Sequence, residues 1–163
     1  MIIKLVEFTD KHLSDNYISW LNDPEVVKFS QQRLKRHTKY SSELYINEFK
    51  HKGNFFFAIE ADECHVRHAA VTMLDYGSRA DLGILIGDRS YWGLGVVGSA
   101  WGQAIEFLKL EKKVKKITAG TLEVNYSMRR LAEKAGMQPV KCNETLKWQS
   151  KEIKILRYEI NLD

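Results

Sequence analysis

The first part of the chain alternates between short apolar runs and segments in which apolar residues recur at helical spacing. The runs at 2–8 and 55–60 are rich in β-branched and aromatic residues and predict strands, the second of them buried. Between them, the apolar residues of 13–21 would lie on one face of a helix, with Asp10 as its N-cap. The pattern therefore predicts a strand, a helical region and a second strand.

End signals divide that helical region into three helices. Asp23 followed by Pro24 is a cap with proline at the first helical position, which predicts the start of a second helix. Thr38 predicts the cap of a third helix, which ends before Gly53. The polar segment 30–37 between the second and third helices is predicted to be a connection.

After residue 60 the pattern changes to a run of strands and then to alternating strands and helices. The predicted elements are strands at 68–75 and 81–87, a helix with apolar positions from Val97 to Leu108, a strand at 114–122, a helix at 126–135 closed by Gly136, and a strand at 152–160. The helix between the strands 81–87 and 114–122 would make these two strands parallel neighbours. The alternation slips at Leu156, which predicts a bulge. The fold class is therefore α+β, with a mixed, mostly antiparallel central sheet flanked by helices.

The composition is that of an ordinary globular domain. The chain has 163 residues, of which 44% are hydrophobic and 28% charged, and this predicts a single domain over residues 1–163. No apolar run reaches the ~18 residues of a membrane span. The formal charge of +4 suits an anionic small molecule, but no stripe of clustered basic residues predicts binding to nucleic acid. We therefore expect neither a membrane nor a nucleic acid as partner.

The cysteines and histidines do not predict a disulfide or a metal site. Cys64 and Cys142 lie far apart with no C-x-x-C pair, which favours a reducing, cytoplasmic location. His65 and His68 lie three residues apart, but without a second cluster they do not predict a bound metal. We expect both histidines at the surface.

A glycine-rich turn links a predicted strand to a predicted helix. The stretch SYWGLGVVGSAW, residues 90–101, has glycines in the spacing G-x-G-x-x-G. Such a turn suits a phosphate, because the first N–H groups of a helix lack partners and glycines let the ligand approach the backbone. The six residues 87–92 separate Ile86, the last apolar residue of the strand, from Gly93, and an antiparallel meander precedes the strand. Both features disfavour a dinucleotide-binding domain. Another pyrophosphate ligand, NAD and a purely structural turn remain as alternatives.

Two stretches together resemble a known family. DLGILIGDRSYWGLGVVGSAW, residues 81–101, followed by VNYSMRRLAEKAGM, residues 124–137, resembles the GNAT superfamily of acetyl-CoA-dependent N-acetyltransferases. The branch with ribosomal-protein N-acetyltransferases and amino-sugar acetyltransferases is the most similar. YISWLNDPEVVKF at 17–29 and LKWQSKEIKILRYEI at 146–160 extend the resemblance over essentially the whole chain.

The resemblance implies a binding site for acetyl-CoA as acetyl donor. The pyrophosphate would lie on the backbone N–H groups of Trp92, Gly93, Leu94, Gly95, Val96 and Val97. Pantetheine would hydrogen-bond the backbone of Ile84, Leu85 and Ile86, as an added strand does. Arg89 would be a phosphate partner, and Asn125 would contact the cofactor, cap the following helix, or do both. Ser90 stands where the family has glutamine or arginine, which removes a side-chain contact but leaves the backbone cradle.

The implied reaction moves acetyl from the thioester to a primary amine. A base must take a proton from the ammonium, and a strand N–H near Leu85 could stabilise the oxyanion. Ala132 occupies the position at which many family members have a tyrosine as general acid, so this role is open. Tyr126 and Ser127 are the candidate substitutes. Asp81 is the candidate base, with Glu123 and His37 as weaker ones.

The resemblance implies that the acceptor binds the N-terminal helices and the polar connection between them. Its candidate substrate-binding residues are Gln31, Gln32, Arg33 and His37, joined by Arg36. These side chains suit an anionic or hydroxylated amine. The segment also resembles those of branch members that act on nucleotide-linked amino sugars, where arginine would face phosphate, so the resemblance slightly favours such a substrate. A protein N-terminus and a polyamine stay open, although a polyamine would require acidic residues that this segment lacks. A non-catalytic acyl-CoA-binding module and an NAD-dependent enzyme are the alternative functions, and a homodimer is one option for the assembly.

Overall fold

The computed structural model describes residues 1–162, with Ile86 described by its backbone only. The strands are β1 (Ile3–Glu7), β2 (Phe55–Ala61), β3 (Cys64–Leu74), β4 (Arg79–Ile86), β5 (Lys116–Leu122), β6 (Gln138–Val140), β7 (Thr145–Trp148) and β8 (Lys151–Asn161). The α-helices are α1 (Asp15–Leu21), α2 (Lys39–His51), α3 (Val96–Leu110) and α4 (Tyr126–Lys134), and the short 3-10 helices are η1 (Asp10–His12), η2 (Gln31–Leu34), η3 (Asp75–Gly77) and η4 (Arg89–Tyr91).

The strand order is β1-β2-β3-β4-β5-β8-β6, with β7 also paired to β8. Among these pairs β4–β5 is parallel and the others are antiparallel, so the predicted mixed sheet is confirmed.

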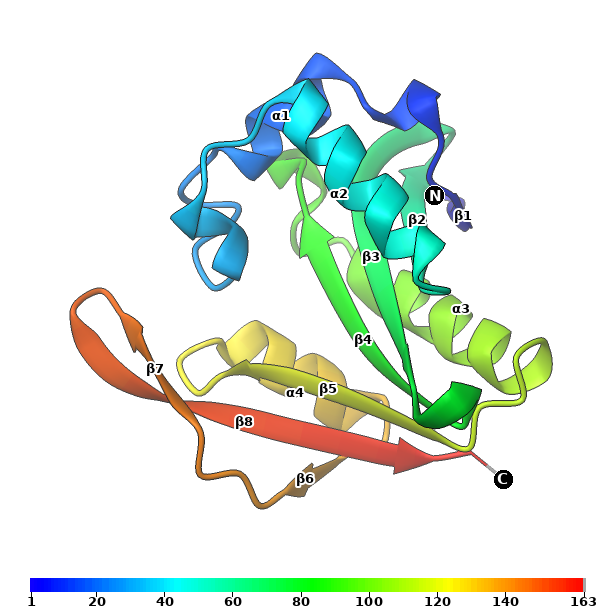
Figure 1. The fold of residues 1–163 in the computed structure, drawn as a ribbon, viewed down its shortest axis with the longest axis vertical. Helices are drawn as coiled ribbons and strands as arrows, with labels where there is room; N and C mark the ends of the chain where they lie inside the picture. The colour runs from blue at the N-terminus through cyan, green and yellow to red at the C-terminus, as the bar shows by residue number, and fades with distance from the viewer. Residues whose placement is uncertain (163) are drawn as a thin grey trace.

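The two central strands pair at one end and separate at the other (Figure 1). β4 and β5 are in register from Arg79 with Lys116 to Asp81 with Thr118, and no pairing follows among the described residues. The sheet therefore splits into one half built from β1–β4 and another built from β5–β8. A split between parallel strands leaves backbone groups of β4 free to bind an extended ligand.

Helices cover both faces of the β1–β4 half (Figure 1). On one face, Trp101, Ala104 and Leu108 of α3 are buried against β3 and β4, as their spacing predicts. On the other face, Tyr17 of α1 and Ile46 of α2 pack with residues of β2. We call these the α3 face and the α1–α2 face. No helix within residues 1–162 is long and apolar enough to cross a membrane.

The predicted ends of the two helices α2 and α4 are confirmed. Thr38 caps α2 by accepting from Ser41 N at 3.0 Å, and Gly53 follows that helix with φ of +85°. Gly136 follows α4 with φ of +81°. The β-branched and aromatic runs likewise form the expected strands.

Several predicted local features are wrong. Ser14, not Asp10, caps α1, because Asp10 already belongs to η1. Asp23 and Pro24 are followed by turns instead of a helix, although the Asp23 carboxylate accepts from Glu25 N as a helix cap would and is also paired with Arg89. No bulge occurs at Leu156. The sheet irregularity lies between Ile59 and Glu60 of β2, and the short strands β6 and β7 were not predicted.

Candidate active site

The glycine turn joins the end of β4 to the start of α3. The backbone N–H groups of Gly87 and Asp88 both donate to Val66 O at 3.2 Å, so the turn is anchored on β3. Gly93 and Gly95 have φ of +77° and +78°, which side chains of L residues rarely adopt. A Cβ added at either glycine would meet no atom within 4 Å, so this part of the turn faces open space.

The first turn of α3 has free N–H groups at its start. Gly95 is the N-cap and provides no side-chain acceptor for them. The helix is 15 residues long, and its dipole places partial positive charge at this end. Trp92 and Leu94 beside the turn are 42% and 56% exposed. An anion could therefore approach these N–H groups from the solvent side, which fits a phosphate group.

Arg89 lies next to the turn but points at another segment. Its guanidinium donates to both carboxylate oxygens of Asp23, at 2.5 and 2.6 Å. Asp88 accepts from Ser90 N at 2.9 Å and thereby caps η4. Arg89, the predicted phosphate partner, therefore lies beside the turn, but its charge is paired with Asp23 in the loop after α1.

The candidate residues at the start of α4 have mainly structural partners. Asn125 caps α4 by accepting from Met128 N at 3.4 Å, as one of its two predicted roles requires. Tyr126 is 68% exposed, with the Arg129 guanidinium 5.3 Å from its ring centre. Ser127 is also exposed, and neither residue lines the cavity described next.

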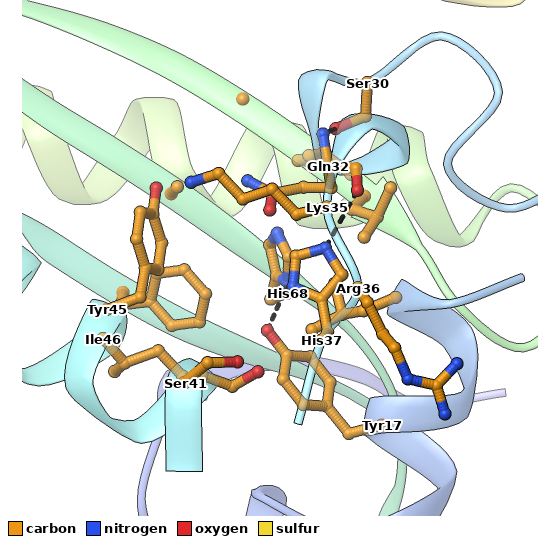
Figure 2. A pocket seen from close by; sticks show the side chains of 17 residues that line it. Tyr17, Ser30, Gln32, Lys35, Arg36, His37, Ser41, Tyr45, Ile46 and His68 are labelled. Carbon is orange, nitrogen blue, oxygen red and sulfur yellow. Dashed lines mark hydrogen bonds between the residues drawn. The ribbon is translucent and has the colours of Figure 1, made fainter. Parts of the chain in front are cut away.

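A cavity of about 280 Å³ opens on the α1–α2 face, between the helices and β2, β3 and β4 (Figure 2). Its lining residues are Tyr17, Leu21, Ser30, Gln32, Lys35, Arg36, His37, Ser41, Ser42, Tyr45, Ile46, Phe56, His68, Ala70, Gly83, Ile84 and Leu85. Of the predicted acceptor residues, Gln32 and His37 line it, whereas Gln31 and Arg33 do not. The described lining contains no aspartate or glutamate, so the charges here come from lysine and arginine.

Two histidines organise the polar side of this cavity (Figure 2). The Tyr17 hydroxyl lies 2.8 Å from Nδ1 of His68. His37 Nε2 lies 2.9 Å from Gln32 O, and the backbone of His37 pairs with the Asn22 side chain at 2.7 and 2.8 Å. The first contact ties α1 to β3, and the others tie the loop between α1 and α2 to itself and to the end of α1.

Burial keeps His68 uncharged. Desolvation lowers the pKa of the His68 imidazole to about 3, and the nearby positive charge of Arg67 acts in the same direction. Burial likewise lowers the pKa of His65 to about 4. The expectation that both histidines lie at the surface is therefore wrong. They belong to an aromatic cluster in which Tyr17 stacks on His65, with ring centres 5.7 Å apart.

The candidate base Asp81 lies on the same face of β4 as Gly83, nearer to the point where the sheet splits. Asp81 Oδ1 accepts from Thr118 Oγ1 at 2.7 Å and from Arg157 at 2.8 Å. Arg157 reaches Asp81 across Gly120, where an added Cβ would clash with the guanidinium. Asp81 does not line the cavity, and its assignment as base stays a prediction.

The hairpin of β7 and β8 contacts the loop that supplies much of the cavity lining. Trp148 Nε1 donates to Lys28 O at 2.7 Å, and its ring stacks on Phe29 with centres 5.5 Å apart. Arg33 donates to Lys147 O at 3.2 Å, which explains why this residue points away from the cavity. The hairpin therefore supports the loop between α1 and α2 from the second half of the sheet.

Sequence patterns did not single out Tyr17 or His68 as site residues. Tyr17 fits the apolar stripe of α1 and is 2% exposed, so helical periodicity assigns it to the core. The alternation that places His68 and Ala70 on one face of β3 was the only sequence pattern that could have indicated the position of His68. It could not identify Tyr17 as the partner of His68, because the contact joins residues 51 positions apart.

Comparisons with known proteins agree with this architecture. The family model described as an acetyltransferase (GNAT) domain matches residues 3–138. The solved N-acetyltransferase from Staphylococcus aureus Mu50 has a TM-score of 0.81 at 15% identity, with 100% of both chains covered. RimL, a ribosomal L7/L12 α-N-protein acetyltransferase in complex with coenzyme A, has a TM-score of 0.86 at 9% identity, over 99% of this chain and 94% of that one.

A further solved structure is spermidine N-acetyltransferase from Vibrio cholerae in complex with coenzyme A and spermine. Its TM-score is 0.85 at 14% identity, over 98% of this chain and 95% of that chain. A comparison with curated proteins finds no match. At these identities the structures establish the fold, while the family model covers most of the sequence itself. The chain therefore belongs to the GNAT family of acetyltransferases, with acetyl-CoA as the acetyl donor.

Proposed function

We propose that this acetyltransferase modifies the primary amine of a small acceptor that also carries negative charge, such as a nucleotide-linked amino sugar. The observation that carries this proposal is the charge of the cavity lining. Lys35 and Arg36 are present there, and the described lining has no carboxylate. Phosphate groups pair well with such side chains, whereas a second ammonium group would find no partner.

The donor site follows from the glycine turn. The open cradle at Gly93 and Gly95 would take the pyrophosphate of acetyl-CoA on the N–H groups of residues 92–97. The backbone of Ile84–Ile86 would hold pantetheine where β4 has separated from β5. Arg89 would join the phosphates by exchanging its pairing with Asp23. The thioester would then lie at the edge of the cavity formed by β4.

The cavity also favours the neutral form of the amine. A basic, partly desolvated environment lowers the pKa of an ammonium group, so the proton can leave to water before attack. An α-amino group, with a pKa of about 7.7–8.0, loses this proton more readily than a lysine-like amine at about 10.4. A protein N-terminus, as in the RimL substrate, is thus the second acceptor class, and a polyamine is the least suited.

The first test is calorimetric titration with acetyl-CoA and then with NAD under the same conditions. We expect micromolar binding of acetyl-CoA and none of NAD. Absence of acetyl-CoA binding would contradict the donor site, whatever the acceptor is.

The second test is an acceptor panel scored by kcat/KM. We expect a nucleotide-linked amino sugar to exceed the free amino sugar by about tenfold, which corresponds to ~1.4 kcal/mol from one charged contact. The double variant Lys35→Gln/Arg36→Gln should remove this difference, and Lys39→Gln, an exposed lysine at the start of α2, is the matched control. Spermidine as the best substrate would contradict the proposed acceptor class.

A further inference from the structure

A buried tyrosine and a histidine form a hydrogen-bonded pair in the wall of the acceptor cavity (Figure 2). The Tyr17 hydroxyl and His68 Nδ1 are 2.8 Å apart, and Tyr17 is 2% exposed. Both side chains line the cavity together with Gly83 and Leu85 of β4. The pair therefore lies beside the strand that the proposed function assigns to the donor.

The sheet register places His68 next to the position of the reacting carbonyl. His68 of β3 is the direct cross-strand partner of Leu85 in β4. Side chains of directly opposed residues in an antiparallel pair lie on the same face, with Cβ atoms about 5 Å apart. This step rests on the proposed function, in which the thioester lies alongside Ile84–Ile86.

His68 is a poor base in this environment. Burial lowers the pKa of its imidazole to about 3, so the ring is neutral at physiological pH. A base that weak has little tendency to take the proton of an ammonium group with a pKa of about 10.4. The imidazole is better suited to donate a hydrogen bond than to accept a proton.

Tyr17 determines which imidazole nitrogen carries the hydrogen. Burial raises the pKa of the Tyr17 phenol above its usual range, so the phenol stays protonated and can donate. Its O–H group points at Nδ1 of His68, which must then act as acceptor. In a neutral imidazole the hydrogen is consequently on Nε2, which has no hydrogen-bond partner among the described residues.

We propose that His68 is a catalytic residue whose Nε2–H group donates to the acetyl oxygen as that oxygen becomes an oxyanion, and that Tyr17 is the positioning residue that fixes this tautomer. The amine lone pair attacks the carbonyl carbon while the π electrons move to the oxygen that Nε2–H stabilises. The electrons on oxygen then re-form the carbonyl bond as the carbon–sulfur bond breaks. The nitrogen loses its proton to water, and the departing thiolate takes up a proton from water to become the free thiol. Removal of one fixed donor of this kind from other acyl-transfer sites lowers kcat by about 100-fold.

The kinetic test compares two substitutions of His68 of similar size. His68→Met removes the donor, and we expect kcat to fall by about 100-fold with the dissociation constant of acetyl-CoA unchanged. His68→Gln keeps an N–H group near the position of Nε2, and we expect it to recover at least about tenfold of the loss. Tyr17→Phe should lower kcat without weakening acetyl-CoA binding. His51→Met and Tyr40→Phe, both exposed residues of α2, are matched controls with unchanged rates.

Nitrogen NMR of the histidine rings tests the tautomer directly and needs no acceptor. We expect His68 to show hydrogen on Nε2 and to remain neutral from about pH 8 down to about pH 5, whereas Tyr17→Phe should mix the two tautomers. Hydrogen on Nδ1, or titration of His68 near its ordinary pKa, would overturn the inference. So would equal loss of kcat in folded His68→Met and His68→Gln. If His68→Met does not fold, His68→Gln and Tyr17→Phe decide by the same criteria. In each case acetyl-CoA binding by the unmodified protein leaves the proposed function standing, and its absence contradicts that function separately.

Discussion

The regions proposed to bind the acetyl donor and the acceptor are built from different parts of the chain. The glycine turn offers backbone N–H groups in one continuous segment from β4 to α3, and its glycines have no side chains to interfere. The cavity on the α1–α2 face is built from side chains of α1, α2, the loop between them, and three strands. One region therefore depends on local backbone conformation, and the other depends on how distant elements pack.

This difference determines how each region responds to substitution. A site built from backbone groups tolerates substitution of side chains that point away from it, but not substitution of a glycine whose φ must be positive. A site built from side chains is harmed more by a change of conformation than by the loss of one contact, because several groups share the recognition. Substitutions in the two regions should consequently separate acetyl-CoA affinity from acceptor recognition.

The largest effect is expected for Gly95→Glu. Gly95 has φ of +78°, which strains any L residue, and a carboxylate there would occupy the space proposed for the pyrophosphate. We expect acetyl-CoA affinity to fall by more than about 100-fold, or ~2.7 kcal/mol. Calorimetry on a variant with an unchanged circular dichroism spectrum measures this loss.

The control for that substitution is Gly102→Ala. Gly102 lies within α3, has no atom within 4 Å of an added Cβ, and is not part of the turn. Alanine should leave acetyl-CoA affinity unchanged and stabilise the helix by about 0.5–1 kcal/mol. Unchanged affinity in a folded Gly95→Glu protein would show that the turn does not hold the donor.

The same contrast explains what the sequence could predict. The glycine turn proposed for the donor could be predicted as a strand, a turn and a helix, because its glycine spacing, the preceding strand and the following helix occupy one local stretch, residues 81–101. The cavity proposed for the acceptor could be predicted only at its loop, where Gln32 and His37 stand among other polar residues. Tyr17 and His68 meet through the packing of α1 on β3, and no local pattern encodes that contact.

The fold shows a similar limit. The spacing of Val97, Trp101, Ala104 and Leu108 predicts α3 because burial on the sheet requires one apolar stripe. Capping signals were less reliable, because a cap can form with no helix after it. Asp23 accepts from Glu25 N and also pairs with Arg89, yet turns follow Pro24. β6 and β7 escape prediction because each is short and depends on pairing with β8.

Substitution of Arg67 would test whether the region proposed for the donor depends on backbone groups alone. Its side chain lies on the α3 face of β3 and is fully buried, and none of its guanidinium nitrogens has a hydrogen-bond partner among the described residues. Neighbours on this face, Ile59 and Ala69, pack with Val96 at the first turn of α3. A buried charge without a partner is unfavourable, and a bound anion at the turn would compensate it.

We therefore expect Arg67→Met to have two opposite effects. The free protein should become more stable by about 1–3 kcal/mol, because a buried charge is replaced by an apolar side chain of similar length. Acetyl-CoA affinity should fall by about tenfold through the lost electrostatic attraction. Thermal unfolding and calorimetry measure the two quantities, with Lys109→Met near the far end of α3 as the control for removing a positive charge. Unchanged affinity would mean that backbone groups carry the donor site without Arg67.

The smallest effect is expected where the acceptor loop meets the hairpin of β7 and β8. Trp148→Ala removes the stack on Phe29 and the hydrogen bond to Lys28 O, so the loop that carries Gln32 and Arg36 loses support. We expect the acceptor KM to rise about threefold, equivalent to under ~1 kcal/mol for one lost contact, while acetyl-CoA affinity is unchanged. Trp148→Phe keeps an aromatic ring for the stack but lacks the N–H donor, so it should fall between the two proteins in acceptor KM. Initial rates at saturating acetyl-CoA measure this order. A loss of acetyl-CoA affinity in Trp148→Ala would mean that the hairpin supports both regions, and the separation between a backbone-built donor site and a side-chain-built acceptor site would then not hold.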